Sequence, residues 1–177
     1  MHRIAVFFIV FLVGLVGPVL AADTATQSVQ LNVDEVCVID VTGDPAALTI
    51  TAPALGGQTP AGVSDNSTYA QYTSVVCGAA ARSLTANWGG ADAAPSGCSL
   101  SLEVTGLTAG CGSPVVGGIT VSSVAQNIVG SIGSCATGTG ATDGAQLTYT
   151  LSVSDHTQLD SCDDQAVTVT LTLTDAS

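Results

Sequence analysis

Two runs near the end of the chain alternate strictly between apolar and polar residues. They cover residues 146–153, with the sequence QLTYTLSV, and residues 166–174, with the sequence AVTVTLTLT. Successive side chains of a β-strand point to opposite faces, so a period of two residues predicts two strands. Each strand would carry an aliphatic row on one face and a row of hydroxyl groups on the other. We expect the aliphatic rows to pack in a core and the threonine rows to face solvent.

The same alternation appears in residues 23–33, where Val29, Leu31 and Val33 are separated by polar residues. This pattern predicts an early strand. The acidic pair Asp34 and Glu35 separates it from the next apolar run. Two arrangements stay open at this point: the segment pairs within its own domain as an edge strand, or it leaves that domain and completes the sheet of a neighbouring copy.

Short strand-like runs also fill the middle of the chain, separated by segments rich in glycine and proline. Residues 36–41 are apolar on both faces except at Asp40, which is typical of a central strand. Further runs cover residues 47–51, 69–77, 82–88, 98–104 and 119–132. The chain is therefore predicted to be all-β, with a single immunoglobulin-like β-sandwich of about eight or nine strands.

The first residues have the pattern of a signal peptide. His2 and Arg3 precede an unbroken apolar run that closes on small residues at Ala21 and Ala22. The run is shorter than the ~20 apolar residues of a membrane-spanning helix. We therefore expect a signal peptide at 1–22, an N-terminal strand at 23–34 and a sandwich domain at 35–177. The protein would be exported to the cell surface or the extracellular space, with no membrane insertion after cleavage.

The charge balance limits the possible partners. The chain has 14 acidic residues against 2 Lys and Arg, for a formal net charge of −12. Arg3 would leave with the signal peptide, so Arg82 would be the only strong base of the mature protein. Phosphate binding depends on Lys and Arg, and this composition therefore excludes nucleic acid as a partner.

Six cysteines follow the signal peptide, an even number that predicts up to three disulfides in an oxidising compartment. The first choice of pair is Cys98 with Cys111, because they flank a short segment that contains glycine. Closing so short a loop would stabilise the fold by about 3 kcal/mol. Elimination then pairs Cys37 with Cys77 and Cys135 with Cys162. No C-x-x-C spacing exists, so a zinc site is not expected.

Two polar motifs are candidate sites. Four carboxylates lie close together in the sequence and offer oxygen ligands of the kind that Ca²⁺ prefers; they are Asp155, Asp160, Asp163 and Asp164. They lack the spacing of an EF-hand loop, and the alternative is a solvated acidic turn. Asn66 begins the glycosylation sequon Asn-Ser-Thr in a segment that we expect to be a loop, where an unmodified asparagine is the alternative.

No catalytic template fits the sequence, and we predict that the protein is not an enzyme and holds no cofactor other than the candidate Ca²⁺. His156 is the only histidine behind the signal peptide, and it sits beside Asp155 in a polar turn where no third group orients it as a base. The acidic residues lack the aromatic cleft of a glycosidase, because aromatic residues make up only 4% of the chain.

Several blocks of the sequence resemble a poorly characterised family of secreted bacterial β-sandwich proteins, many of which end in a strand similar to VTVTYTLTD. The blocks are YAQYTSVV at 69–76, PSGCSLSL at 95–102, AQNIVGSIGSC at 125–135 and the C-terminal part from residue 137, which closes on VTVTLTLTDA. The order of signal peptide, alternating N-terminal strand, cysteine-containing second strand and terminal strand is also similar to pilins that assemble by donor-strand exchange, including chaperone–usher fimbriae.

This second resemblance implies a structural subunit of an extracellular filament or surface layer. Such a subunit would polymerise by β-strand addition, with copies of itself as partners and with Val29, Leu31 and Val33 as the side chains that the N-terminal strand donates. The alternative is a monomeric secreted adhesin or Ca²⁺-dependent binding module. Fold alone does not decide between them.

Overall fold

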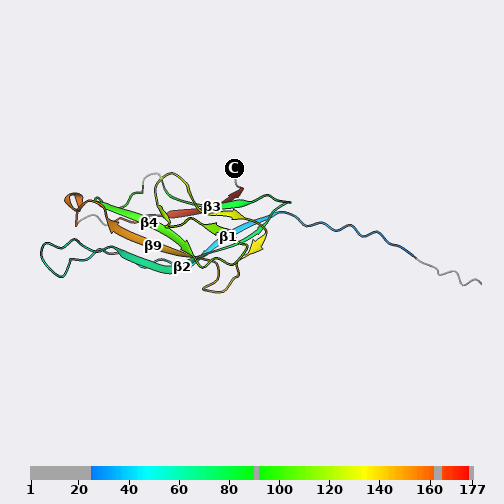
Figure 1. Cartoon of the computed structure of the whole chain (residues 1–177), viewed down its shortest axis with the longest axis horizontal. Helices are drawn as coiled ribbons and strands as arrows, with labels where there is room; N and C mark the ends of the chain where they lie inside the picture. Colours follow the sequence, from blue (N-terminus) through cyan, green and yellow to red (C-terminus); the bar gives the residue numbers. More distant parts are fainter. Residues whose placement is uncertain (1–24, 90–91, 162–164, 176–177) are drawn as a thin grey trace, which may run out of the picture. The chain divides into compact units, whose positions relative to one another are not determined.

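The computed structural model describes residues 25–89, 92–161 and 165–175. It divides into two compact units, Met1–Asn32 and Val33–Ser177, and the second is an all-β sandwich. Two antiparallel sheets form its layers (Figure 1). The predicted β-sandwich is thereby confirmed. Its strands are β1 (Val36–Thr42), β2 (Val63–Val75), β3 (Arg82–Trp88), β4 (Cys98–Thr105), β5 (Ser113–Pro114), β6 (Ile119–Thr120), β7 (Gln126–Ile132), β8 (Cys135–Ala136), β9 (Ala145–Val153) and β10 (Val169–Asp175).

The first sheet has the strand order β1-β2-β9-β4-β6, and β8 also pairs with β2. The second has the order β10-β3-β7-β5. Strand β9 shows how the sequence pattern becomes structure: Leu147, Tyr149 and Leu151 are buried, while the alternate residues are half-buried. It pairs with β2 on one side and β4 on the other, so its aliphatic row lies at the centre of the sheet.

The core lies between the two sheets. Leu102 and Leu147 of the first sheet and Leu84, Ile128 and Ile132 of the second are among its largest fully buried side chains. Full burial of such a side chain contributes about 1.5–3 kcal/mol. Gly118 has a φ of +68°, and a Cβ there would meet the carbonyl group of Leu102, so the turn into β6 requires a residue without a side chain.

Three strand predictions are corrected by the structure. Residues 36–41 form β1, which is an edge strand with Val38 58% exposed, and not a central strand. Residues 47–51 carry no strand, and the last strand begins at Val169 instead of residue 166. Residues 47–51 and 166–168 have strand-like apolar patterns, but no neighbouring strand pairs with them. Strand β1 does pair with β2, but on one edge only.

The N-terminal segment also departs from the prediction. The described part of it, residues 25–35, forms no strand. Val29, Leu31 and Val33 are 70%, 86% and 83% exposed. Residues 23 and 24 lie outside the described part. The segment therefore keeps the sequence pattern of a strand without a ladder partner to complete it.

Candidate functional site

A groove of about 1470 Å³ opens between the two edge strands β1 and β10. Its floor is formed by Leu100 of β4 and by Tyr149 and Leu151 of β9. One wall is the end of β1 together with residues 43–52, and the other is β10 together with residues 165–167. Small-molecule pockets usually measure about 300–1,000 Å³, so this groove is large enough for an extended stretch of polypeptide.

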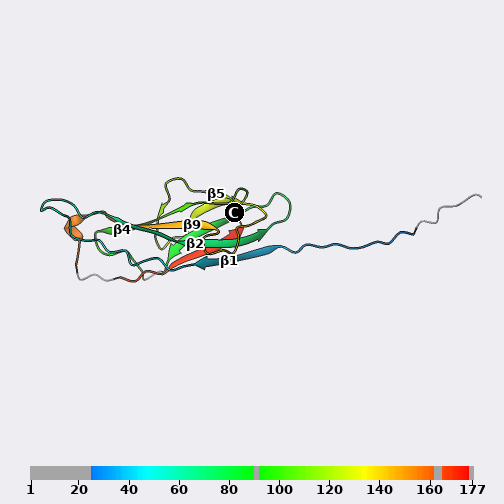
Figure 2. The ribbon, with the colours of Figure 1, turned by 90° about the horizontal axis from the view of Figure 1, so that it is seen from below.

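The edge strands lie beside each other at one end of the sandwich, as Figure 2 shows for β1 in blue and β10 in red. There the Sγ atom of Cys37 lies 3.5 Å from the carbonyl oxygen of Leu173, which is buried. Along β10 toward the other end, Leu171 and Val169 are only half-buried, although they belong to the same inward row. The space between the sheets is thus filled near Leu173 and open near Val169.

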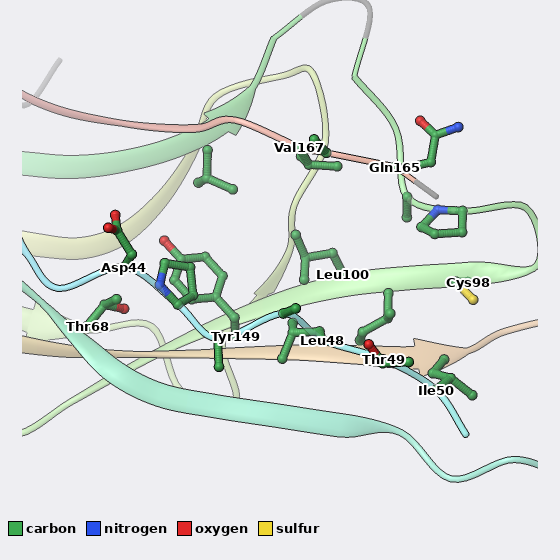
Figure 3. A pocket seen from close by; sticks show the side chains of 18 of the residues that line it. Asp44, Leu48, Thr49, Ile50, Thr68, Cys98, Leu100, Tyr149, Gln165 and Val167 are labelled. Atoms are coloured by element: carbon green, nitrogen blue, oxygen red, sulfur yellow. The ribbon is translucent and has the colours of Figure 1, made fainter. Parts of the chain in front are cut away.

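The groove is open near Val169 because two segments of the chain do not join a sheet. Residues 43–52 follow β1 and residues 165–168 precede β10, and neither segment forms a strand. Leu48, Ile50 and Val167 from these segments line the groove and are half-buried. Figure 3 shows Leu48 and Leu100 pointing into the same space. Most of the side chains that line the groove are apolar. Within the described residues, the outer edges of β1 and β10 pair with no other strand.

Polar side chains lie at both ends of the groove. Asp44, Thr68 and Tyr149 lie together at one end, and Gln165 lies at the opposite end with Ile50 and Cys98 (Figure 3). The side chain of Thr68 is turned inward behind a bulge in β2 between Asp65 and Thr68, and the residue is 1% exposed. Among the described residues, Thr68 Oγ1 is the only buried side-chain nitrogen or oxygen without a hydrogen-bond partner. Leaving such a group without a partner costs about 1–3 kcal/mol.

Tyr149 in this groove and Tyr72 in the core both have pKa values raised to about 12, because burial disfavours the phenolate. The unfolded chain releases these protons near pH 10, below the pH at which the folded chain does. Above pH 10 the unfolded state therefore binds fewer protons, and stability falls as pH rises toward 12. Urea unfolding followed between pH 9 and pH 12 should show this loss, with about 1.4 kcal/mol per pKa unit for each tyrosine as the upper limit. A flat profile above pH 10 would contradict it.

Arg82 forms a second polar cluster that the sequence did not reveal. It is 3% exposed, and its guanidinium donates to the carbonyl oxygen of Val36 at 2.6 Å and to Ser74 Oγ at 3.1 Å. It also forms ion pairs with Glu35 at 2.6 Å and Asp175 at 3.2 Å. The cluster ties the start of β1 to the ends of β2 and β10, at the closed end of the groove. The only indication in the sequence was that Arg82 is the sole Lys or Arg after the predicted signal peptide.

The candidate calcium residues do not gather in the described structure. Asp155 caps a 3₁₀ helix (His156–Gln158), where its carboxylate accepts hydrogen bonds from Thr157 and Gln158. The hydrogen bonds that Thr157 donates from its hydroxyl group and its backbone N–H lower the pKa of Asp155. Asp160 lines the open end of the groove, and Asp163 and Asp164 lie outside the described residues. Within the described ranges no three acidic, histidine or cysteine side chains form a metal-binding group.

The disulfide pairing differs from the prediction. Cys111 is bonded to Cys135, with a Cα–Cα distance of 5.5 Å. The proposed pairs of Cys98 with Cys111 and of Cys135 with Cys162 are therefore wrong. Cys98 begins β4, and eight residues of continuous strand carry the chain about 25 Å away before it turns toward Cys111. Cys162 lies outside the described residues.

Cys37 and Cys77 do not form the predicted third bond. Both are exposed and unbonded in the structure. The ladder places Cys37 opposite Ser74, three residues before Cys77. The pairing of Cys37 with Cys77 was inferred by elimination from the pair Cys98 and Cys111, and that pair does not form.

Asn66 lies within β2 and not in the predicted loop. Asn66 is exposed, and its backbone carbonyl oxygen accepts a hydrogen bond from the Gln146 side chain. It lies on the bulge, while Thr68, the third residue of the sequon, is buried. Glycosylation stays a prediction. His156 is exposed in the 3₁₀ helix, next to the capping Asp155.

Comparison with known protein families, with characterised proteins and with solved structures finds no match to this chain. The described part of the chain also holds no helix that is long and apolar enough to cross a membrane.

Proposed function

We propose that the protein is a structural subunit of an extracellular filament or surface layer, similar to a pilus or fimbria, which polymerises by β-strand addition. The observation that carries the proposal is the exposed, unpaired aliphatic row of Val29, Leu31 and Val33 in a chain that also has an apolar groove between two free strand edges. Residues 25–33 of one copy would occupy the groove of the next.

The chemistry of the segment fits this role. Residues 25–33 carry no charge, so their insertion would bury no ion in a protein with a net charge of −12. As a strand they would span about 30 Å, with side chains alternating between the groove and solvent. The free edges of β1 and β10 offer main-chain hydrogen bonds, and each buried aliphatic side chain would contribute about 1.5–3 kcal/mol.

Addition of this kind joins copies head to tail. The donated segment and the groove are different surfaces, so each copy that receives a strand still has its own to give. Such a contact need not close into a ring and produces a filament. Export to an oxidising compartment, as the signal-peptide pattern and the disulfide between Cys111 and Cys135 suggest, belongs to the same proposal.

Negative-stain microscopy with immunogold labelling tests this function. Cell-surface material and concentrated purified protein are expected to contain regular filaments or sheets that carry the label. A protein that stays monomeric in both preparations would contradict the proposal and favour a monomeric binding module.

A further inference from the structure

The inward face of the donated segment contains one polar residue. A strand that points Val29, Leu31 and Val33 into the groove also points Gln27 into it, because the period is two. A glutamine amide buried against aliphatic side chains would lose its hydrogen bonds to water. Stable docking therefore requires a polar position in the groove that can receive Gln27.

The groove has such a position at the end where Asp44, Thr68 and Tyr149 meet (Figure 3). Thr68 lines the groove, and its hydroxyl group has no partner within the described structure. The hydroxyl is covered in the single chain, so a rotation of this side chain would have to turn it toward the incoming amide. A hydroxyl group both donates and accepts, so it matches either end of a glutamine amide. The nearby carboxylate of Asp44 can accept a second amide hydrogen.

We propose that Gln27 of one copy binds Thr68 of the next and thereby fixes the register and direction of the donated strand. This inference rests on the proposed function and names the residue pair that makes the joint specific. A slip of one residue would turn Ser28, Gln30 and Asn32 inward. A slip of two would place Gln27 among aliphatic side chains and leave Thr68 unpaired.

The pair also sets the direction of the strand. With Gln27 at the Thr68 end, Val29, Leu31 and Val33 extend toward the end that Gln165 marks. The chain leading into β10 runs the other way, from Gln165 through Val167. The donated strand would therefore lie antiparallel to β10, which is the slightly more stable ladder.

A double-mutant cycle tests the pair. The acceptor is the mature full-length chain with Leu31→Asp, whose own segment is disabled, and the ligand is a synthetic peptide of residues 25–33. Calorimetry should show that Gln27→Leu in the peptide weakens binding about tenfold, as expected for loss of a buried hydrogen bond. The matched control is Gln30→Leu, which changes the same residue type on the outward face and should alter affinity by less than about twofold. In an acceptor that also carries Thr68→Val, the penalty of Gln27→Leu should disappear.

Direction is read separately from the same complex. A nitroxide on the peptide N-terminus should broaden the amide resonance of Thr68, and one on the C-terminus that of Gln165. If the unmodified peptide binds but Gln27→Leu and Gln30→Leu have equal effects, or the nitroxide pattern is reversed, this inference is wrong while strand addition stands. If the unmodified peptide does not bind at all, both this inference and the proposed function fail.

Discussion

Replacing Leu31 with Asp is expected to leave the protein folded but unable to assemble. Leu31 is 86% exposed in the single chain, so the change should not alter the free energy of unfolding by more than about 0.5 kcal/mol. In the proposed assembly, however, an aspartate would enter the groove without a positive partner. Burial of an unpaired carboxylate costs several kcal/mol, which weakens each joint about a thousandfold or more.

Asn32→Asp is the matched control for this prediction. It adds the same charge one residue away, on the face that points to solvent in the proposed joint. Sedimentation velocity should find Leu31→Asp monomeric at concentrations where the wild type and Asn32→Asp form assemblies. Equal loss in both variants would indicate general charge repulsion, and the groove would then not be the site of contact.

Replacing Arg82 with Met is expected to cause the largest loss of stability among single changes outside the apolar core. The guanidinium donates hydrogen bonds to the hydroxyl of Ser74 and to the carbonyl oxygens of Val36 and Val75. Methionine has a similar length but no hydrogen-bond donor. Removing one partner from a buried polar network leaves the others unsatisfied, so we expect a loss of about 3 kcal/mol in urea unfolding.

Asp175→Asn separates the buried donors from the surface ion pair. The Asp175 side chain is 82% exposed, so its pair with Arg82 should contribute about 0–1 kcal/mol. If Asp175→Asn destabilises the chain as much as Arg82→Met, or if Arg82→Met unfolds like the wild type, the cluster does not hold the strand ends as described.

The sequence predicted the parts of the fold in which local pattern and tertiary environment agree. The alternating run at 146–153 became β9 and that at 98–104 became β4, because each has a paired strand on both of its edges. Period two reports which residues share a face. It does not report whether a neighbouring strand is present to form the ladder.

The misassigned strands show this limit. Residues 25–33 and 47–51 have strand-like patterns but no partner strand in the structure, and residues 36–41 form an edge strand despite apolar residues on both faces. Because these segments lack partner strands, the groove stays open between the sheets. The sequence shows the apolar pattern but not the missing partner, so the groove could be located only in the structure.

The long-range contacts were equally beyond the sequence. The bond between Cys111 and Cys135 depends on how β2 brings β8 toward the segment after β4, and spacing carries no information about that. Arg82 was identified by composition as a unique base, yet its role depends on the convergence of Glu35, Ser74 and Asp175 around it. The hydroxyl group of Thr68 has no partner because of a bulge in β2, and no residue type in this stretch of the sequence predicts that bulge.

The most direct test of strand addition removes the donated segment and then supplies it from outside. Residues 33–177 form a compact unit, and its first residue, Val33, is 83% exposed. A chain that begins at residue 34 should therefore remain folded, with circular dichroism and a urea midpoint close to those of the full chain. We expect it to stay monomeric and to bind one equivalent of a peptide of residues 25–33, with a rise in its unfolding midpoint. Assemblies that persist after the deletion would contradict the account, because the strand that is meant to join the copies would be absent.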